Sequence, residues 1–315
     1  MRLAFILDPL DQIKTYKDTS FAMMQEAALR GHEIHAMQQE DVVLAGNEVI
    51  GNARHLSLTG DSHDWYRAGI PQIARLNAFD AVLMRKDPPF DMEYLYSTYL
   101  LELAETRGAR VFNGPRAVRD HNEKLATAKF PQFTVPILVT RDGELIREFL
   151  AEHGDVILKP LDAMGGASIF RVREDDVNLS VIIEIMTELG RRSIMAQRFI
   201  PEIVKGDKRI LLIDGKPAPY SLARIPKLGE TRGNLAVGGT GVAQPLSARD
   251  REIAESIGPT LALQGLLLVG LDVIGDYLTE VNVTSPTCMQ EIREQTGFNV
   301  AAMMIDALEA KVNGD

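Results

Sequence analysis

The sequence contains a single cysteine in 315 residues, and this scarcity excludes two kinds of site. One thiol cannot form a disulfide within the chain, and it cannot build a zinc site from cysteines. The residue is Cys288, which has no histidine near it in the sequence. Free cysteines are more often small buried hydrophobic residues than nucleophiles. We therefore expect a buried thiol without a catalytic role, in a reducing, cytoplasmic setting.

Long apolar runs and an excess of basic residues are also missing. The longest apolar stretch, at 266–274, is interrupted by Asp272 and is too short to span a bilayer. Lysine and arginine total 34 against 44 aspartates and glutamates, so the formal net charge is −10. A general nucleic-acid binder or a membrane-surface binder needs a basic field. We expect neither kind of partner, although a local basic pocket for one small anionic ligand is compatible with this charge.

The familiar nucleotide and zinc motifs are absent as well. The chain has no G-x-x-x-x-G-K-[ST] phosphate loop, no G-x-G-x-x-G after its first strand and no H-E-x-x-H. Its six histidines show no spacing that is typical of metal ligands. Any nucleotide or metal site must therefore be built in another way.

Strand-like and helix-like periods alternate along the chain, which is typical of α/β and α+β folds. We expect three units. The first is an open α/β unit at 1–122, the second a small α+β unit at 123–199, and the third an α+β unit at 200–315.

A glycine-rich stretch at 226–241 is too long to be a passive connection within a compact domain. Arg232 and Asn234 offer polar groups inside it. It is predicted either as a lid that closes over a reactive intermediate or as a surface loop, and the sequence favours neither.

The best chemical signal is LDVIGDYLTEVN at residues 271–282. Alternate residues of a strand point to one face, so Glu280 and Asn282 project together. A three-residue hairpin loop would place Asp272 opposite Glu280, whereas a two-residue turn would pair it with Thr279 and send it to the other face. The first arrangement groups two carboxylates and an amide oxygen, the kind of donor set that Mg²⁺ prefers. The alternative is the exposed polar face of an edge hairpin.

Positive charge at predicted strand ends suggests a phosphate site in this acidic protein. The candidates are Lys124, Lys159, Arg209 and Arg224. Gly165 and Gly166 could bring backbone N–H groups against phosphate oxygens, because no Cβ blocks the approach. A Gly-Gly pair between two strands is equally a plain hairpin turn.

These segments, in this order, resemble the ATP-grasp ligases, and most closely the bacterial glutathione synthetases. The resemblance runs from Met1 to the last helix. Its most specific segments are MRKDPPFD at 84–91, LKPLDAMGGAS at 158–168, LARIP at 222–226 with ETRGN at 230–234, and GLDVIG at 270–275 through EVNVTSPT at 280–287. It implies an ATP-grasp fold, in which an open α/β (pre-ATP-grasp) domain precedes two α+β subdomains that bind the nucleotide between them.

The resemblance also implies an activity. Such an enzyme uses ATP and Mg²⁺, or Mn²⁺ as a substitute, to join γ-glutamylcysteine to glycine through an acyl phosphate, giving glutathione, ADP and phosphate. It further implies a homotetramer. Two alternatives are another ATP-grasp peptide ligase, such as a D-alanine–D-alanine ligase, and a non-catalytic ATP-binding regulatory module.

The resemblance implies roles for the residues of this chain that stand at matching positions. The ATP contacts would be Lys124, Lys159 and the glycine loop Gly165, Gly166, Ala167 and Ser168 for the phosphates, the hinge Gln197, Arg198, Phe199 and Ile200 for adenine, and Asp207 for ribose. Asp272, Glu280 and Asn282 would hold Mg²⁺. Arg209, Arg224 and Asn234, together with Arg232, would form the catalytic group. The candidates for binding the peptide substrate are Asp8, Arg85, Ser285 and Thr287.

Overall fold

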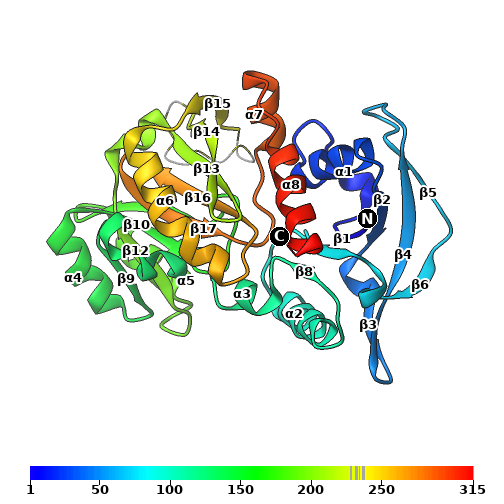
Figure 1. Ribbon diagram of the computed structural model, residues 1–315. Helices are drawn as coiled ribbons and strands as arrows, with labels where there is room; N and C mark the ends of the chain where they lie inside the picture. Colours follow the sequence, from blue (N-terminus) through cyan, green and yellow to red (C-terminus); the bar gives the residue numbers. More distant parts are fainter. Residues whose placement is uncertain (228, 231–232, 234, 236–237, 315) are drawn as a thin grey trace.

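Three sheets organise the described part of the chain, and they follow one another along the sequence (Figure 1). The structure is a computed structural model that describes residues 1–227, 229–230, 233, 235 and 238–314. Its mixed α/β architecture confirms the predicted fold class. The limits of the three expected units remain predictions. None of the described helices is long and apolar enough to cross a membrane.

The first sheet combines a parallel centre with an antiparallel edge. Its strands are β1 (Arg2–Ile6), β2 (Glu33–Met37), β3 (Val42–Ala45), β4 (Glu48–Leu58), β5 (Tyr66–Ala68), β6 (Gln72–Arg75), β7 (Ala81–Met84) and β8 (Val111–Phe112). Their order is β3-β4-β2-β1-β7-β8, and β5 and β6 pair with β4. Ligands bind to open α/β sheets beyond the carboxyl ends of the strands. Asp8 and Arg85 follow β1 and β7 at that edge.

Three helices accompany this sheet, namely α1 (Thr19–Leu29), α2 (Met92–Glu105) and α3 (Pro115–Arg119). The Asp18 carboxylate accepts a hydrogen bond from the Phe21 N–H at 2.7 Å, and Asp91 accepts one from the Tyr94 N–H at 2.9 Å. These caps satisfy donors that a helix leaves unpaired at its N-terminus. Both helices therefore begin where a short acidic side chain stands in the sequence.

The second sheet is a small antiparallel unit with its own core. Its strands are β9 (Ile137–Thr140), β10 (Asp155–Pro160), β11 (Phe170–Arg173) and β12 (Ile194–Arg198), in the order β11-β10-β12-β9. Helices α4 (Gly143–His153) and α5 (Leu179–Met186) accompany it. Ile146, Leu158 and Ile183 belong to a hydrophobic cluster whose members all come from this unit. The unit therefore packs as a separate piece.

The third sheet carries most of the polar residues that matter below. Its strands are β13 (Asp207–Ile213), β14 (Lys216–Ile225), β15 (Thr240–Pro245), β16 (Leu268–Ile274) and β17 (Tyr277–Asn282), in the order β15-β14-β13-β16-β17. The helices here are α6 (Ala248–Leu263), α7 (Met289–Thr296) and α8 (Val300–Asn313). The last helix lies beside α1 (Figure 1), where Arg30 pairs with Asp306 at 2.6 Å and Glu309 at 3.1 Å. The C-terminal end of the chain thus returns to the first sheet.

The β16–β17 hairpin corrects one prediction and confirms another. Asp272 does lie opposite Glu280, as the three-residue loop predicted. The turn, however, has two residues, because Ile274 pairs with Tyr277. A β-bulge at Thr279 adds one residue to β17 and restores the pairing, and the Thr279 hydroxyl donates to the Asp272 carbonyl at 3.1 Å. The predicted position of Asp272 opposite Glu280 is confirmed, and the predicted three-residue loop is wrong.

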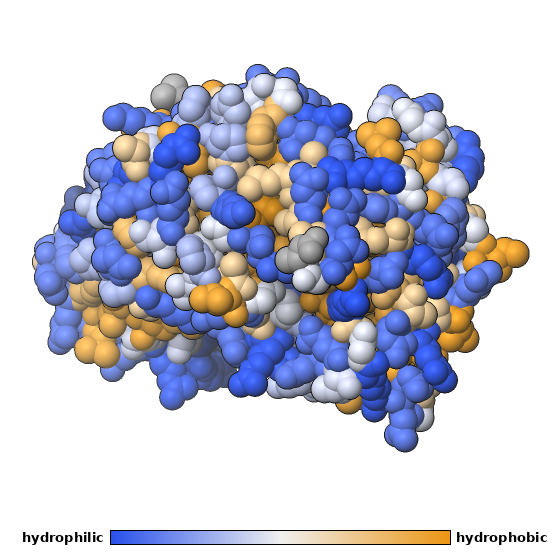
Figure 2. All heavy atoms as spheres, in the orientation of Figure 1, coloured by the Kyte–Doolittle hydropathy of each residue, from blue (hydrophilic) through white to orange (hydrophobic). Residues whose placement is uncertain are grey.

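Hydrophilic residues predominate on the face of the molecule that Figure 2 shows, and apolar ones occur there in small groups. The single thiol is inside, since Cys288 is 1% exposed. This burial confirms the predicted environment of the cysteine.

A half-buried acid on α2 should make stability depend on pH. Burial and the neighbouring charge of Glu102 raise the pKa of Glu105 to about 7, against the opposing effect of Arg119. The folded chain therefore holds a proton that the unfolded chain has lost between about pH 4.5 and 7, so stability falls as pH rises through that window. We expect Glu105→Gln to raise the melting temperature relative to the wild type more at pH 8 than at pH 5.

Thermal unfolding at the two pH values checks this expectation. Glu148→Gln, at an exposed position of α4, is the matched control and should change little at either pH. An equal effect of Glu105→Gln at pH 5 and pH 8 would show that Glu105 titrates alike in both states.

Candidate active site

A cavity of about 440 Å³ opens among the three sheets, and each of them contributes to its lining. Asp8 comes from the first part of the chain, Lys159 from the second and Arg209 from the third. The predicted site residues that line it are Asp8, Arg85, Lys124, Lys159, Gly165, Gly166, Gln197, Arg198, Phe199, Ile200, Asp207, Arg209, Arg224, Glu280, Asn282, Ser285 and Thr287. The structure therefore brings most of the predicted set to one place.

Five predicted residues are not part of that lining as described. Ala167 and Ser168 are exposed outside it, and Asp272 is buried next to Arg209 and Arg224 without being part of the lining itself. Arg232 and Asn234 lie outside the described residues. Their neighbours Gly233 and Leu235 do line the cavity, so the glycine-rich stretch reaches its wall.

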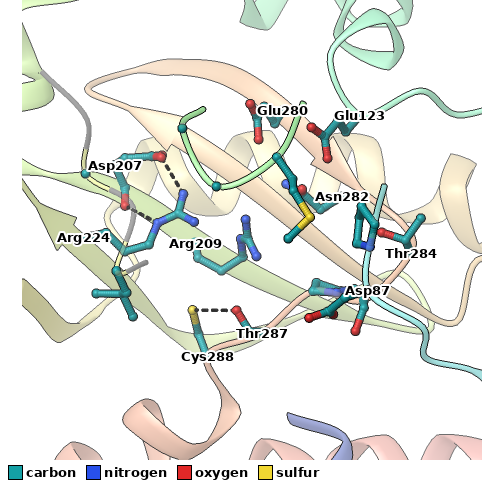
Figure 3. A pocket seen from close by; sticks show the side chains of 18 of the residues that line it. Asp87, Glu123, Asp207, Arg209, Arg224, Glu280, Asn282, Thr284, Thr287 and Cys288 are labelled. Atoms are coloured by element: carbon teal, nitrogen blue, oxygen red, sulfur yellow. Dashed lines mark hydrogen bonds and ion pairs between the residues drawn. The ribbon is translucent and has the colours of Figure 1, made fainter. Parts of the chain in front are cut away.

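Two arginines that line the cavity, Arg209 and Arg224, belong to a buried cluster with Asp207 and Asp272. Arg209 on β13 stands opposite Asp272 on β16 and donates to it through Nε at 2.5 Å and Nη2 at 2.8 Å. The Nη2 of Arg224, on β14, lies 2.8 Å from the same carboxylate and donates to Asp207 at 2.5 Å (Figure 3). Burial alone would raise the pKa of Asp272, but the two guanidiniums outweigh it and hold that pKa well below its usual range.

The pKa of Asp207 is shifted in the opposite direction from the pKa of Asp272. Burial raises its pKa to about 7, although Arg224 opposes the shift. Its Oδ2 accepts from Arg224, whereas its buried Oδ1 has no hydrogen-bond partner among the described residues. A buried acceptor without a donor is costly, so this oxygen is suited to a hydroxyl or N–H group of a ligand.

Glu280 and Asn282 on β17 form an oxygen-bearing face together with Glu123, which the sequence reading missed (Figure 3). With its amide oriented to satisfy both neighbours, Asn282 accepts from Arg209 Nη2 and donates to Glu123 Oε2, each at 3.3 Å. The Glu123 carbonyl accepts from the Val281 N–H at 2.8 Å, which fixes it against β17. Burial, and then the charge of Glu280, raise the pKa of Glu123 to about 7. Only its place in sequence beside Lys124 could have pointed to it.

The two lysines of the cavity differ in their partners. The buried Lys124 ammonium donates to the Glu123 carboxylate and to the Ala163 carbonyl, and lies 3.8 Å from Glu280. The buried Lys159 ammonium donates to the Thr279 carbonyl at 3.3 Å and, within the described chain, forms no ion pair. Burial lowers the pKa of Lys159, although the charge of Glu280 opposes the shift. An anionic ligand beside the ammonium would oppose the shift further.

The glycine loop between β10 and β11 has an unusual backbone conformation, and the hinge at the end of β12 has hydrogen bonds of its own. Gly165 and Gly166 have φ of +65° and +81°, the left-handed region that favours glycine. On the hinge, the Arg198 N–H donates to the Pro136 carbonyl and the Phe199 N–H to the Asp155 carbonyl. These two N–H groups are therefore not available to a ligand. The buried Gln197 Nε2, by contrast, has no partner in the described part of the chain.

Arg85 joins the first sheet to the segment after β17. Its guanidinium donates to the Ser20 hydroxyl at 3.1 Å and to the carbonyls of Thr284 and Pro286 at 3.4 and 3.0 Å. The Ser285 hydroxyl donates back to the Arg85 carbonyl at 3.2 Å. Arg85 therefore positions this wall of the cavity.

Two further predicted substrate residues already have partners within the protein. Asp8 pairs with Lys86 at 2.6 Å and accepts from the Asp87 N–H at 2.9 Å. The Thr287 hydroxyl lies 3.9 Å from the Cys288 sulfur. Burial raises the pKa of that thiol to about 11, so the sulfur is protonated at neutral pH.

The donor set of the oxygen-bearing face fits a hard divalent cation. Carboxylate and amide oxygens are what Mg²⁺ takes from proteins, with phosphates and waters completing its octahedron. Over the residues described, histidine, cysteine, aspartate and glutamate side chains alone form no group of three around a metal position. The set therefore depends on the Asn282 amide and on oxygens that a ligand would bring.

Two family models match the chain. The model described as prokaryotic glutathione synthetase, N-terminal domain, matches residues 1–119, and the one described as prokaryotic glutathione synthetase, ATP-grasp domain, matches residues 123–297. The chain is 65% identical to a glutathione synthetase of Nitrosomonas europaea over 99% of its own length and 98% of that protein. It is 54% identical to that of Vibrio parahaemolyticus over the whole of both chains.

Solved structures agree on the fold. A D-cycloserine synthetase superimposes with a TM-score of 0.71 at 14% identity, covering 99% of this chain and 100% of that one. A RimK-domain ATP-grasp protein of Sphaerobacter thermophilus gives 0.65 at 20% identity, over 98% and 99% of the two chains. At these identities the likeness concerns the ATP-grasp fold alone.

The buried cluster makes a prediction about stability. Asp272→Asn leaves two buried guanidiniums without their shared carboxylate, and breaking a buried pair in this way costs about 3–5 kcal/mol. Glu280→Gln leaves Lys124 paired with Glu123, so we expect it to lower the free energy of unfolding by less than about 1 kcal/mol. Urea denaturation of both variants compares the two values. Equal losses would contradict the distinction between a structural and an open carboxylate.

Proposed function

Because the chain belongs to the prokaryotic glutathione synthetase family, we propose that its central cavity is where the cysteinyl carboxylate of γ-glutamylcysteine is activated and joined to glycine. The chain is an ATP-dependent carboxylate–amine ligase that forms glutathione, ADP and phosphate. The assignment of the site rests on one observation. The buried Lys159, which has no ion-pair partner among the residues that the structure describes, lines the same cavity as the oxygen-bearing face of Glu280 and Asn282.

A carboxylate is a poor electrophile and must be activated before an amine can attack it. When bound, ATP supplies the γ-phosphoryl group that makes the carboxylate an acyl phosphate, from which the glycine amine displaces phosphate. No nucleophilic side chain is needed, in keeping with a buried and protonated Cys288. The work of the protein is charge neutralisation, positioning and exclusion of water.

The phosphates of ATP would lie between Lys159 and the glycine loop. Lys159 forms no ion pair with any described residue, and the positive φ of Gly165 and Gly166 suits backbone N–H groups that face phosphate oxygens. Lys124 would contribute once a phosphate competes with its carboxylate partners. Ala167 and Ser168 would act through the shape of the loop.

The nucleoside part would extend along β12 and the start of β13. The orphan Oδ1 of Asp207 suits a ribose hydroxyl. Gln197 offers its unpartnered amide nitrogen, and Phe199 and Ile200 line the same wall. Because the N–H groups of Arg198 and Phe199 are already used, adenine recognition would fall on the remaining backbone groups of the hinge.

Asp272, Glu280 and Asn282 would hold Mg²⁺, with Mn²⁺ as a substitute, and the cation would neutralise phosphate charge. A carboxylate has about four acceptor positions, and Asp272 uses three of them on Arg209 and Arg224. One position therefore remains for a cation.

Arg209 and Arg224 would stabilise the transferred phosphoryl group, together with Asn234 and Arg232 from the glycine-rich stretch. The two arginines are held in place by Asp272 before any ligand arrives, so little reorganisation is required. The stretch at 226–241 would act as a lid, since Gly233 and Leu235 already line the cavity and an acyl phosphate must be kept from water.

We further propose a cytoplasmic homotetramer. A buried free thiol suits a reducing compartment. Val181, Ile185 and Leu189, in and just after α5, are exposed apolar side chains of the kind that subunit contacts cover.

Product analysis tests the activity directly. Incubation with ATP, Mg²⁺, γ-glutamylcysteine and glycine should yield glutathione, ADP and phosphate in equal amounts. D-Alanine in place of both amino-acid substrates should yield no ADP. Turnover with D-alanine alone would favour a D-alanine ligase, and nucleotide binding without ADP formation in either mixture would favour a regulatory module.

The metal face gives a second test. We expect Glu280→Gln and Asn282→Ala each to lower kcat by at least about 100-fold, because a ligand that orients the cation and the phosphates is lost. The melting temperature should change little. Measurement of kcat and of the melting temperature for each variant checks this expectation. A large fall in melting temperature that accompanies the fall in kcat would mean that Glu280 and Asn282 have a structural role.

A further inference from the structure

The cavity is also lined by two charged residues that the proposed mechanism does not use. Lys17 belongs to the loop between β1 and α1, and Glu291 to α7. Both line the cavity, as Asp8 and Arg85 do, and both are half-buried. They come from segments about 270 residues apart, so their approach is a product of the fold.

The two segments are bonded to each other. The Gln290 side chain, next to Glu291, donates to the Thr15 carbonyl at 2.9 Å. The Thr15 hydroxyl donates to the Ser62 carbonyl at 2.9 Å, and the Lys17 N–H closes a turn on the Lys14 carbonyl at 3.0 Å. The loop that carries Lys17 is thus held against α7 independently of any ligand.

Among the described residues, the Lys17 ammonium has no carboxylate partner, and one carboxylate oxygen of Glu291 has no hydrogen-bond donor. In the part of the chain described, no carboxylate oxygen lies within 4.0 Å of the Lys17 ammonium. The Oε2 of Glu291 is buried and, over the same residues, accepts no hydrogen bond. A buried carboxylate oxygen without a donor is costly. The wall therefore presents one cation and one unsatisfied anion, held near each other but unpaired.

We propose that Lys17 and Glu291 bind the free amino-acid head group of the γ-glutamyl residue, Lys17 its α-carboxylate and Glu291 its α-ammonium. This inference rests on the proposed function, which places the cysteinyl carboxylate at Arg209 and the oxygen-bearing face. The glutamyl end then extends along the wall of the same cavity that Lys17 and Glu291 line.

The pair would also select the γ linkage. In a γ-glutamyl peptide the ammonium and the carboxylate are on one carbon, so a facing lysine and glutamate can bind both. In an α-linked glutamyl peptide the free carboxylate is at the end of the side chain, several bonds from the ammonium. The fixed spacing of the pair would not suit it.

Substrate analogues test the assignment group by group. Glutarylcysteine lacks the ammonium, and 4-aminobutanoylcysteine lacks the carboxylate. For the wild type we expect each deletion to lower kcat/KM by about 10-fold to 100-fold, the worth of one charge-assisted contact. Lys17→Met should abolish the penalty for losing the carboxylate and keep the penalty for losing the ammonium. Glu291→Gln should do the reverse.

The controls are Glu294→Gln, one turn away on α7, and Lys216→Met, at the start of β14; both side chains are exposed, and both variants should retain the two penalties of the wild type. KM for ATP should be unchanged in all variants.

Two results would overturn this inference while glutathione is still formed. The first is a wild type whose kcat/KM is not lowered by either deletion, a result that does not depend on any variant folding. The second is a pair of variants whose penalties for the two deletions match those of the wild type. Absence of glutathione from the wild-type reaction would overturn the proposed function, and this inference with it.

Discussion

The site depends on a balance of charge that has been removed from water. Four basic groups, on Lys124, Lys159, Arg209 and Arg224, meet four acidic ones, on Glu123, Asp207, Asp272 and Glu280, around one cavity. Asp272 stays ionised because two arginines bond to it, whereas burial raises the pKa of Glu123 and of Asp207 to about 7. The raised pKa values of these two carboxyl groups reduce the negative charge of the cluster, which suits a polyphosphate in a protein whose net charge is −10.

The packing decides which parts can move around this cluster. Hydrophobic residues of the first and third sheets share two clusters, for example Leu3 with Ile213 and Met84 with Ile210. The second sheet has a core of its own, built only from residues of that unit. Because shared cores resist separation and separate cores do not, the second unit is the piece that can open and close over the cavity. It carries Lys159 and the glycine loop, which would move with it.

Sequence reasoning reached the metal face through strand alternation, which places Glu280 and Asn282 on one side whatever the turn. It correctly predicted that Glu280 lies opposite Asp272, but from a three-residue loop that the structure does not have. The bulge at Thr279, which produces this pairing, depends on packing that no local sequence pattern encodes. Glu123 was missed since nothing periodic marks it, and its role follows from a backbone bond to Val281, 158 residues later. Roles for individual residues came from family resemblance, which periodicity could not replace.

The position of Lys124 links the two halves of the ligand site. Its ammonium lies 3.8 Å from Glu280 and bonds both to Glu123 and to the Ala163 carbonyl at the start of the glycine loop. Lys124 can face a phosphate only by weakening its attraction to Glu280, and Glu280 can face a cation only by the same change. A phosphate alone would leave Glu280 without Lys124, and a cation alone would leave Lys124 with Glu123 as its one nearby carboxylate. Together they offset both losses, so the two ligands favour each other's binding, as linkage requires.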